Sequence, residues 1–223
     1  MAVAVITGAS RGLGRALARA LARDGWDLVV DARGAGALEA VAEETGAVAV
    51  VGNVGDVAHR QALLDAARAL GGADVLVNNA SILGPSPQPP LATYPVEVLE
   101  EVYRINVVAP LALAQLFLPD LRQRRGRLIN VTSDAGVEAY EGWGGYGSSK
   151  AALEHAGRVL AVEEPDVRVY SVDPGDMATA MHQEAFPDED ISDRPPPEVS
   201  VPGLVALLTG DRPSGRYVAR ELA

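Results

Sequence analysis

A tyrosine and a lysine four residues apart, Tyr146 and Lys150, are the pair in this sequence best suited to acid–base chemistry. Lys150 is the only lysine among the 19 basic residues of the chain, and the rest are arginines. On a helix, the two side chains lie on one face, and the lysine leans back toward the tyrosine. A nearby ammonium favours the phenolate and lowers the pKa of a phenol from about 10. The pair therefore predicts a proton donor or acceptor that works near neutral pH.

Two polar residues upstream could assist the same chemistry. Ser133 follows an apolar run, and its hydroxyl can donate to a carbonyl oxygen and steady the charge that develops there. Thr132 is the neighbouring alternative for that role. Asn106 lies in a stretch of helical character, where an asparagine is either a polar residue that kinks the helix or a member of the site.

A glycine-rich turn near the start of the chain predicts a nucleotide-binding site. It reads Thr7-Gly8-Ala9-Ser10-Arg11-Gly12-Leu13-Gly14, follows the first apolar run directly and opens a helix. Glycines allow a tight turn and the close approach of a pyrophosphate, and the helix N-terminus offers free N–H groups. The spacing is Gly-x-x-x-Gly-x-Gly, which differs from the G-x-G-x-x-G fingerprint of many dinucleotide-binding proteins.

Short apolar runs alternate with segments of helical spacing along the whole chain. The runs are almost continuously hydrophobic, which is typical of parallel strands covered on both faces. They lie at Val3–Thr7, Leu28–Val30, Val48–Val51, Val75–Val77, Leu128–Val131 and Val167–Val172, and a final edge strand is expected at Arg216–Val218. This order predicts one domain over residues 1–223, an α/β fold with a doubly wound parallel sheet and helices on both faces.

Together, these motifs resemble the short-chain dehydrogenase/reductase family. The resemblance covers about residues 3–180 and rests on the glycine turn, Asn78-Asn79-Ala80, Asn106, Ser133, Tyr146-x-x-x-Lys150 and Pro174-Gly175-x-x-x-Thr179, in the family's order. It implies a Rossmann-type sheet of about seven strands in the order 3-2-1-4-5-6-7. It also implies a nicotinamide-dependent oxidoreductase.

The resemblance assigns a role to each of these residues. Tyr146 would exchange the proton and Ser133 would steady the substrate oxygen, while Lys150 would bond the nicotinamide ribose and Asn106 would hold a water that links the lysine to solvent. The implied cofactor-binding residues are Gly8, Ser10, Arg11, Gly12, Leu13, Gly14, Arg33, Asn53, Val54, Asn79, Ala80, Tyr146, Lys150, Pro174, Gly175 and Thr179. No metal is needed, and we assign the scattered histidines His59, His155 and His182 to structure or surface.

The choice between the two nicotinamide cofactors rests on conflicting signals. An acidic residue at the end of the second strand favours NAD by bonding the adenosine ribose, and Asp31 is close to that position. Aligning the family pattern on Leu38 instead places Ala32 at the discriminating position and Arg33 beside it. Arg33 and Arg11 could bind a 2′-phosphate through charge-assisted hydrogen bonds. We therefore expect NADP(H) in preference to NAD(H).

Composition limits the partners of the protein. A net charge of −11 would repel nucleic acid, and we interpret the basic run at 122–127 as a solvated helix end. The absence of cysteine excludes disulfides and thiol catalysis and fits a cytoplasmic protein. No leader is evident, and no apolar run approaches the roughly 20 residues of a membrane helix. We expect a small-molecule partner, with neither nucleic acid nor membrane.

The side chains around the predicted catalytic residues suggest a substrate pocket. Tyr140 and Trp143 lie between Ser133 and Tyr146 and are candidate apolar walls, with core packing as the alternative; Met181 could close the opposite side. An apolar or aromatic carbonyl compound is the expected substrate. The stretch around 180–198 is a candidate lid, or else a disordered surface loop, because ligands bind at this edge of open α/β sheets.

The function predicted from these residues is an NADP(H)-dependent oxidoreductase that moves hydride between the nicotinamide and a carbonyl or secondary alcohol. An NAD-linked alcohol dehydrogenase and a catalytically silent dinucleotide sensor on the same fold remain alternatives. The intact Ser133, Tyr146 and Lys150 favour chemistry. The chain ends soon after the last strand, a region that relatives use to build tetramers. We therefore expect a homodimer through helices around 97–118 and 146–162, with a tetramer still possible.

Overall fold

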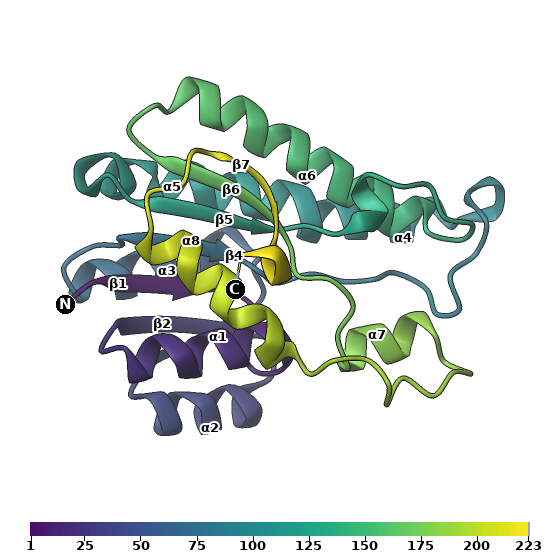
Figure 1. Ribbon diagram of the computed structural model, residues 1–223, viewed down its shortest axis with the longest axis horizontal. Coiled ribbons are helices and arrows are strands. Elements are labelled where there is room, and N and C mark those ends of the chain that lie inside the picture. Colours follow the sequence, from purple (N-terminus) through teal and green to yellow (C-terminus); the bar gives the residue numbers. More distant parts are fainter. Residues whose placement is uncertain (223) are drawn as a thin grey trace.

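Seven parallel strands form the centre of this computed structural model, which describes residues 1–222 (Figure 1). The strands are β1 (Val3–Ile6), β2 (Asp27–Ala32), β3 (Val48–Val51), β4 (Val75–Asn78), β5 (Arg127–Val131), β6 (Arg168–Asp173) and β7 (Gly215–Val218). Their order is β3-β2-β1-β4-β5-β6-β7, and every neighbouring pair is parallel. The predicted fold class and strand order are confirmed, and the expected strands agree with the observed ones to within a few residues.

Helices cover both faces of the sheet because successive strand residues point to opposite sides. The helices are α1 (Gly12–Arg23), α2 (Ala35–Thr45), α3 (Val57–Ala69), α4 (Val96–Tyr103), α5 (Ala109–Arg124), α6 (Gly144–Glu163), α7 (Ala180–Ala185) and α8 (Val201–Thr209). Ala4 and Ile6 of β1 pack in the layer that contains α1, α2 and α8, whereas Val5 packs in the layer of α3 and α5 (Figure 1). Two hydrophobic cores therefore sandwich the sheet.

The chain reverses its direction of winding between β1 and β4, which are neighbours in the sheet. Parallel strands deliver their following loops to one edge, and the reversal opens a crevice there. The glycine turn after β1, Asn79 after β4, Ser133 after β5 and Pro174 after β6 all lie at this edge. The fold thereby gathers segments from across the sequence into one place.

One long apolar helix needs a correction to the sequence analysis. The helices α4 and α5, joined by the π-helical turn η2 (Arg104–Val108), run continuously over residues 96–124. By length and composition, this helix could cross a membrane, with a mean hydropathy of 1.4 in its most apolar window, so the expectation that no segment reaches this length was wrong. Half of that window is buried, because Leu113, Phe117 and Leu121 belong to the core beneath the sheet. Burial in the core explains its apolar composition.

The segment predicted to be a lid contains α7 and an extended return. Its residues contact several parts of the crevice: Ser86 Oγ donates to Glu184 O at 2.6 Å, and the rings of Trp143 and Phe186 are 5.8 Å apart. Ala178 N donates to Pro195 O at 2.8 Å, which closes the base of the segment. Movement of this lid and assembly into a homodimer both stay predictions.

Two glycines of contrasting surroundings test how tightly the last helix is packed. A Cβ at Gly203 in α8 would lie 1.8 Å from Ala219 O, whereas a Cβ at Gly36 in α2 would meet nothing within 4 Å. We expect Gly203→Ala to lower the free energy of unfolding by about 1–3 kcal/mol through overpacking. Gly36→Ala, the matched control, should raise it by about 0.5 kcal/mol through helix propensity. Urea unfolding measures both, and an unchanged stability of Gly203→Ala would contradict the packing described.

Candidate active site

Contacts from two neighbouring strands hold the glycine turn. Gly8 N donates to the Asp31 carboxylate at 2.7 Å, and the Asn79 amide donates to Thr7 O at 2.8 Å and to Gly8 O at 3.1 Å. Gly8 has a φ of 66°, and a Cβ there would lie 2.8 Å from Ala80 Cα. Only glycine fits this turn, because both its backbone conformation and its closeness to β4 exclude a side chain.

The N-terminus of α1 opens directly onto the crevice and is suited to bind an anion. Arg11, at the N-cap, makes no side-chain capping hydrogen bond, so the first N–H groups of the helix are free for a ligand. Gly12 has a φ of 55°, and a Cβ there would fill the space in front of Thr179, 3.5 Å from its methyl group. Free N–H groups at the positive end of a helix fit a pyrophosphate, so the residues present suit a dinucleotide cofactor.

A cleft of about 470 Å³ follows this crevice from the glycine turn to α6. Most of the cofactor-binding residues predicted from the sequence line it: Gly8, Ser10, Arg11, Gly12, Leu13, Arg33, Asn53, Val54, Asn79, Ala80, Tyr146, Lys150, Pro174 and Thr179. Two predicted residues do not. Gly14 lies beneath the turn, where a Cβ would be 2.6 Å from the Asn79 amide, and Gly175 lines a neighbouring smaller pocket.

The end of β2 explains how the conflicting cofactor signals coexist. Asp31 is 1% exposed, and its second carboxylate oxygen lies 2.8 Å from His59 Nε2. The Gly8 amide and His59 each contact one of its oxygens, so this carboxylate shapes the glycine turn, and it also lines the cleft. Arg33 is exposed at the cleft wall, and Arg11 lies 3.8 Å from Glu184 of α7.

Lys150 lies at the inner end of the cleft, under the ring of Tyr146. Its ammonium donates to Val131 O at 2.8 Å and lies 5.4 Å from the ring centroid, which confirms that the two residues share one face of α6. The residue is only 2% exposed. Burial disfavours the charged form and lowers the pKa of Lys150 to about 8.

The electrostatics of Tyr146 differ from the sequence prediction. The ammonium was expected to lower the pKa of this phenol, but burial raises that pKa above its ordinary value. Hydrogen bonding by Ser81 acts in the lowering direction, whereas the charges of Asp134 and Asp173 raise the pKa further. The physical reason is that the ammonium donates to the Val131 carbonyl and faces the ring rather than the hydroxyl. Tyr146 is therefore a protonated donor at neutral pH.

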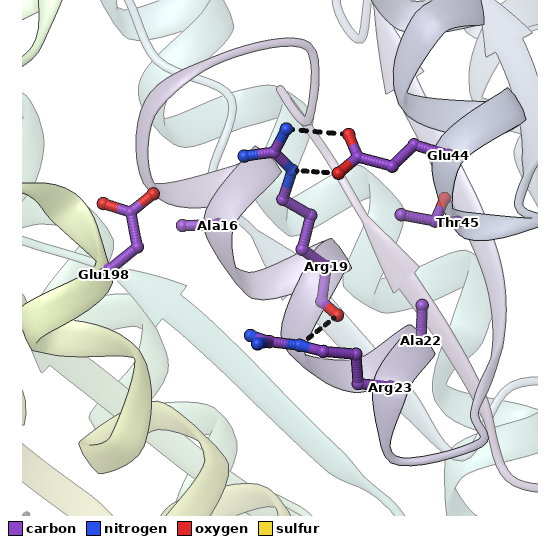
Figure 2. A pocket seen from close by; sticks show the side chains of 7 residues that line it. All are labelled: Ala16, Arg19, Ala22, Arg23, Glu44, Thr45 and Glu198. Carbon is purple, nitrogen blue, oxygen red and sulfur yellow. Dashed lines mark hydrogen bonds and ion pairs between the residues drawn. The ribbon is translucent and has the colours of Figure 1, made fainter.

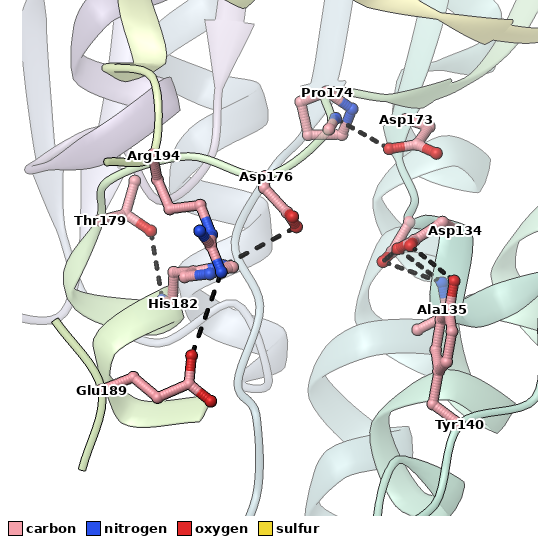
Figure 3. Close-up of polar contacts among 12 residues, drawn as sticks. Asp134, Ala135, Tyr140, Asp173, Pro174, Asp176, Thr179, His182, Glu189 and Arg194 are labelled. Carbon is pink, nitrogen blue, oxygen red and sulfur yellow. Dashed lines mark hydrogen bonds and ion pairs between the residues drawn. The ribbon is translucent and has the colours of Figure 1, made fainter. Parts of the chain in front are cut away.

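A smaller pocket of about 100 Å³ lies on the other side of Tyr146. Ser133, Trp143 and Met181 line it, as predicted for a substrate pocket, whereas Tyr140 does not and is exposed (Figure 3). Tyr146 lines both the cleft and this pocket, which meet at its side chain.

Asp134, which directly follows Ser133, and His182, which comes from α7, line this small pocket but were assigned no substrate role from the sequence. Thr132, the alternative to Ser133 in the sequence analysis, lines it as well. The adjacency of Asp134 to Ser133 was a usable signal. Nothing in the sequence indicated that the α7 histidine, which we had assigned to structure or surface, would reach the pocket.

Asn106 lies in the π-helical turn η2 and is fully buried. Its amide oxygen accepts from Ile82 N at 2.9 Å and from Ser81 Oγ at 3.1 Å, and its nitrogen donates to Ile82 O at 2.9 Å and to Ser149 Oγ at 3.0 Å. The amide thus ties the loop after β4 to the residue before Lys150. It lines neither pocket, so its predicted role as a water holder stays a prediction.

A third cavity, of about 530 Å³, lies between α1, α2 and the turn before α8, away from these residues (Figure 2). Arg19 forms an ion pair with Glu44 at 2.8 Å there, and Arg23 donates to Arg19 O. This cavity contains none of the predicted catalytic or cofactor-binding residues.

Comparisons with known proteins agree with this geometry. Residues 2–190 match the family described as short chain dehydrogenase. Sepiapterin reductase of Mus musculus is 36% identical over 200 residues, which cover 82% of this chain and 77% of the mouse protein. The crystal structure of the KRED1-Pglu enzyme has a TM-score of 0.89 and 32% identity, covering 98% of this chain and 100% of that one. A short chain dehydrogenase of Shigella flexneri 2a, complexed with NADP, has a TM-score of 0.87 and 30% identity. The match covers 98% of this chain and 97% of that one.

The lone lysine permits a direct measurement of its charge. In protein labelled with ¹³C at the lysine ε carbon, one resonance should titrate with a midpoint near 8 rather than near the ordinary 10.5. The unfolded chain then binds more protons than the folded one between these values, so the contribution of Lys150 to stability rises with pH. The unfolding free energy of the wild type, relative to Lys150→Met, should increase by about 2 kcal/mol between pH 7 and pH 9.5. A midpoint above 10 would contradict the burial of this amine.

Proposed function

Because this chain belongs to the short-chain dehydrogenase family, whose members are oxidoreductases that bind a nicotinamide dinucleotide, we propose that it is an NADPH-dependent reductase of carbonyl compounds. The reaction also runs in reverse, as the oxidation of an alcohol. The observation that carries the proposal is the place of Tyr146, whose side chain lies where the cofactor cleft meets the small pocket. A substrate in that pocket lies between the proton donor and the cleft.

Each residue around this junction has a task in the proposed reaction. The residues that line the cleft would hold the reduced nicotinamide, which would supply the hydride for the carbonyl carbon. The protonated phenol of Tyr146 donates its proton to the carbonyl oxygen, and the raised pKa keeps this proton in place until the oxygen gains charge. Ser133 Oγ, at the same pocket, donates a hydrogen bond to that oxygen. The Lys150 ammonium supplies positive charge beneath the ring.

The proposed preference for NADPH rests on the charges at the end of β2. Asp31, the acidic residue near the end of β2, already bonds Gly8 and His59, which makes it a weaker selector for NAD. Arg33 and Arg11 offer two guanidinium groups along the cleft wall, and guanidinium binds phosphate in bidentate fashion. The NADP complex of the Shigella flexneri relative and the reductase name of the mouse relative support the same choice.

Removing the phenolic hydroxyl tests the proposed proton donor. Tyr146→Phe should lower kcat by about 10²–10⁴-fold, because the proton transfer is lost, while NADPH binding, followed by cofactor fluorescence, is retained. Tyr94→Phe is the matched control: its hydroxyl is buried without a partner and lines neither pocket. Full activity of Tyr146→Phe in a screen of ketones and aldehydes would refute the proposal, and so would cofactor binding without turnover of any carbonyl or alcohol.

Removing one guanidinium tests the cofactor preference. Arg33→Ala should lower kcat/KM for NADPH by about 10–100-fold, because a charged hydrogen bond to the 2′-phosphate is lost. The value of kcat/KM for NADH should stay within about twofold of the wild type. Arg23→Ala, in the distant cavity of Figure 2, is the control and should change neither value. A wild-type preference for NADH would overturn the assignment, as would an equal loss with both cofactors in Arg33→Ala.

A further inference from the structure

The small pocket beyond Tyr146 is unusually rich in hydrogen-bond acceptors. Asp134, Asp173 and Asp176 line it together with the imidazole of His182 (Figure 3). Among the described residues that line this pocket, there is no arginine or lysine. The arginine drawn near it in Figure 3, Arg194, is bound to Asp193 at 2.7 Å and lies outside the lining.

The aspartates differ in how much of their acceptor capacity the protein itself uses. Asp173 accepts from Gly175 N at 2.9 Å and from the Arg216 guanidinium at 3.0 Å, so its charge is paired. Asp134 has no basic partner: one oxygen accepts from Ser133 Oγ at 2.9 Å and from Ala135 N at 2.8 Å, and the other accepts only from Tyr140 OH, at 3.1 Å. Asp134 therefore presents, next to the reacting groups, a negative charge that no described basic residue pairs; the residue is exposed, so water solvates this carboxylate until a ligand replaces that water.

That charge opposes the proposed chemistry when the substrate is neutral. The only proton of the Ser133 hydroxyl is donated to Asp134, so it is not directed at a substrate oxygen. The same carboxylate contributes to raising the pKa of Tyr146. A cation placed against Asp134 would relieve both effects, because it would compete for the carboxylate and cancel its field.

Two unpartnered polar atoms point to a ligand in the same pocket. Thr132 is 2% exposed, and its hydroxyl has no hydrogen-bond partner although it lines both the pocket and the cleft. His182 Nε2 is likewise buried without a partner. The other nitrogen of this ring, Nδ1, lies 3.9 Å from an Asp176 oxygen, which is longer than a hydrogen bond; in the tautomer with its proton on Nδ1, Nε2 is an acceptor. Both atoms can accept N–H groups from a ligand.

We propose that the substrate carries a protonated amine two or three bonds from its reacting carbon, and that Asp134 binds this cation as the specificity-determining residue. The spacing follows from the geometry: the Ser133 hydroxyl that holds the reacting oxygen lies 2.9 Å from the Asp134 carboxylate. The substrate pair is thus an amino ketone and the corresponding amino alcohol. This inference rests on the proposed reductase function and names its substrate class.

Two alcohols of the same shape test the inference in the oxidation direction. 1-Amino-2-propanol and 2-butanol differ only in an ammonium in place of a methyl group. Once Tyr146 has lost its own proton to solvent, the alcohol gives a hydride to NADP⁺ and its hydroxyl proton to the Tyr146 phenolate, so the net products are the ketone, NADPH and one proton. The wild type should oxidise the amino alcohol with kcat/KM at least about tenfold higher than for 2-butanol, the advantage expected of a charged hydrogen bond. Asp134→Asn, which keeps the acceptor for Ser133, should reduce this ratio to near one.

The control separates the local charge from the overall charge of the protein. Glu138→Gln removes an exposed carboxylate that does not line the pocket and should leave the ratio unchanged. A wild-type ratio of one or less overturns the inference, as does an Asp134→Asn variant that slows both alcohols equally. If neither alcohol is oxidised, each alcohol is tested instead as an inhibitor of the turnover of a ketone that the enzyme does reduce. Equal inhibition by 2-butanol and by the amino alcohol would also overturn the inference. Each of these results contradicts the substrate class while the enzyme still turns over other carbonyl compounds. The absence of turnover with any carbonyl or alcohol would instead refute the proposed function itself.

Discussion

The burial of one ammonium group constrains the rest of the site. Lys150 sits where α6 crosses the end of β5, and within residues 1–222 its ammonium donates only to the Val131 carbonyl. An amine removed from water with so little compensation is destabilising, so its retention points to a task that requires charge at that place. The ring of Tyr146 lies over this ammonium, and the same residue lines both the cleft and the small pocket. The position of the reacting carbon follows from this stack, because it must reach both the phenol and the cleft.

The pair formed by Lys150 and the Tyr146 ring does not lower the pKa of the phenol in the way that the four-residue spacing alone suggested. Spacing places the ammonium on the same helical face as the phenol, but it does not say which end of the ring the ammonium meets. Here the ammonium faces the ring, and desolvation governs the phenol, which stays protonated. A protonated phenol suits reduction, where the first demand on it is to give a proton. Lys150, with a pKa lowered to about 8, remains mostly charged at neutral pH and so still supplies a positive field.

Most of the cleft lining was predictable from the sequence, whereas only part of the lining of the small pocket was, namely Ser133, Trp143 and Met181, and this difference has a physical reason. The cofactor cleft is built by backbone: the free N–H groups of α1, the positive φ of Gly8 and the close approach at Gly14 require particular residues at fixed spacing, so they leave a motif. The small pocket is built by side chains from segments that are far apart in the chain, such as Asp134 after β5 and His182 on α7. Their meeting depends on the path of the segment after β6, which no local pattern encodes.

A carboxylate beside the hydroxyl groups that are proposed to donate to the substrate hinders that donation unless a cation binds to the carboxylate. Asp134 draws the Ser133 proton toward itself and favours the neutral form of Tyr146, so with an uncharged substrate it would hinder both groups. The protein itself does not neutralise it, although it does neutralise Asp173 with Arg216 a short distance along the same lining. Burial contributes to this contrast, because Asp173 is 6% exposed and needs a partner, whereas Asp134 is exposed and can be solvated by water. Under the proposal made above, the ammonium of the substrate would replace that water at Asp134, and cation recognition would then accompany the release of the serine hydroxyl toward the substrate oxygen.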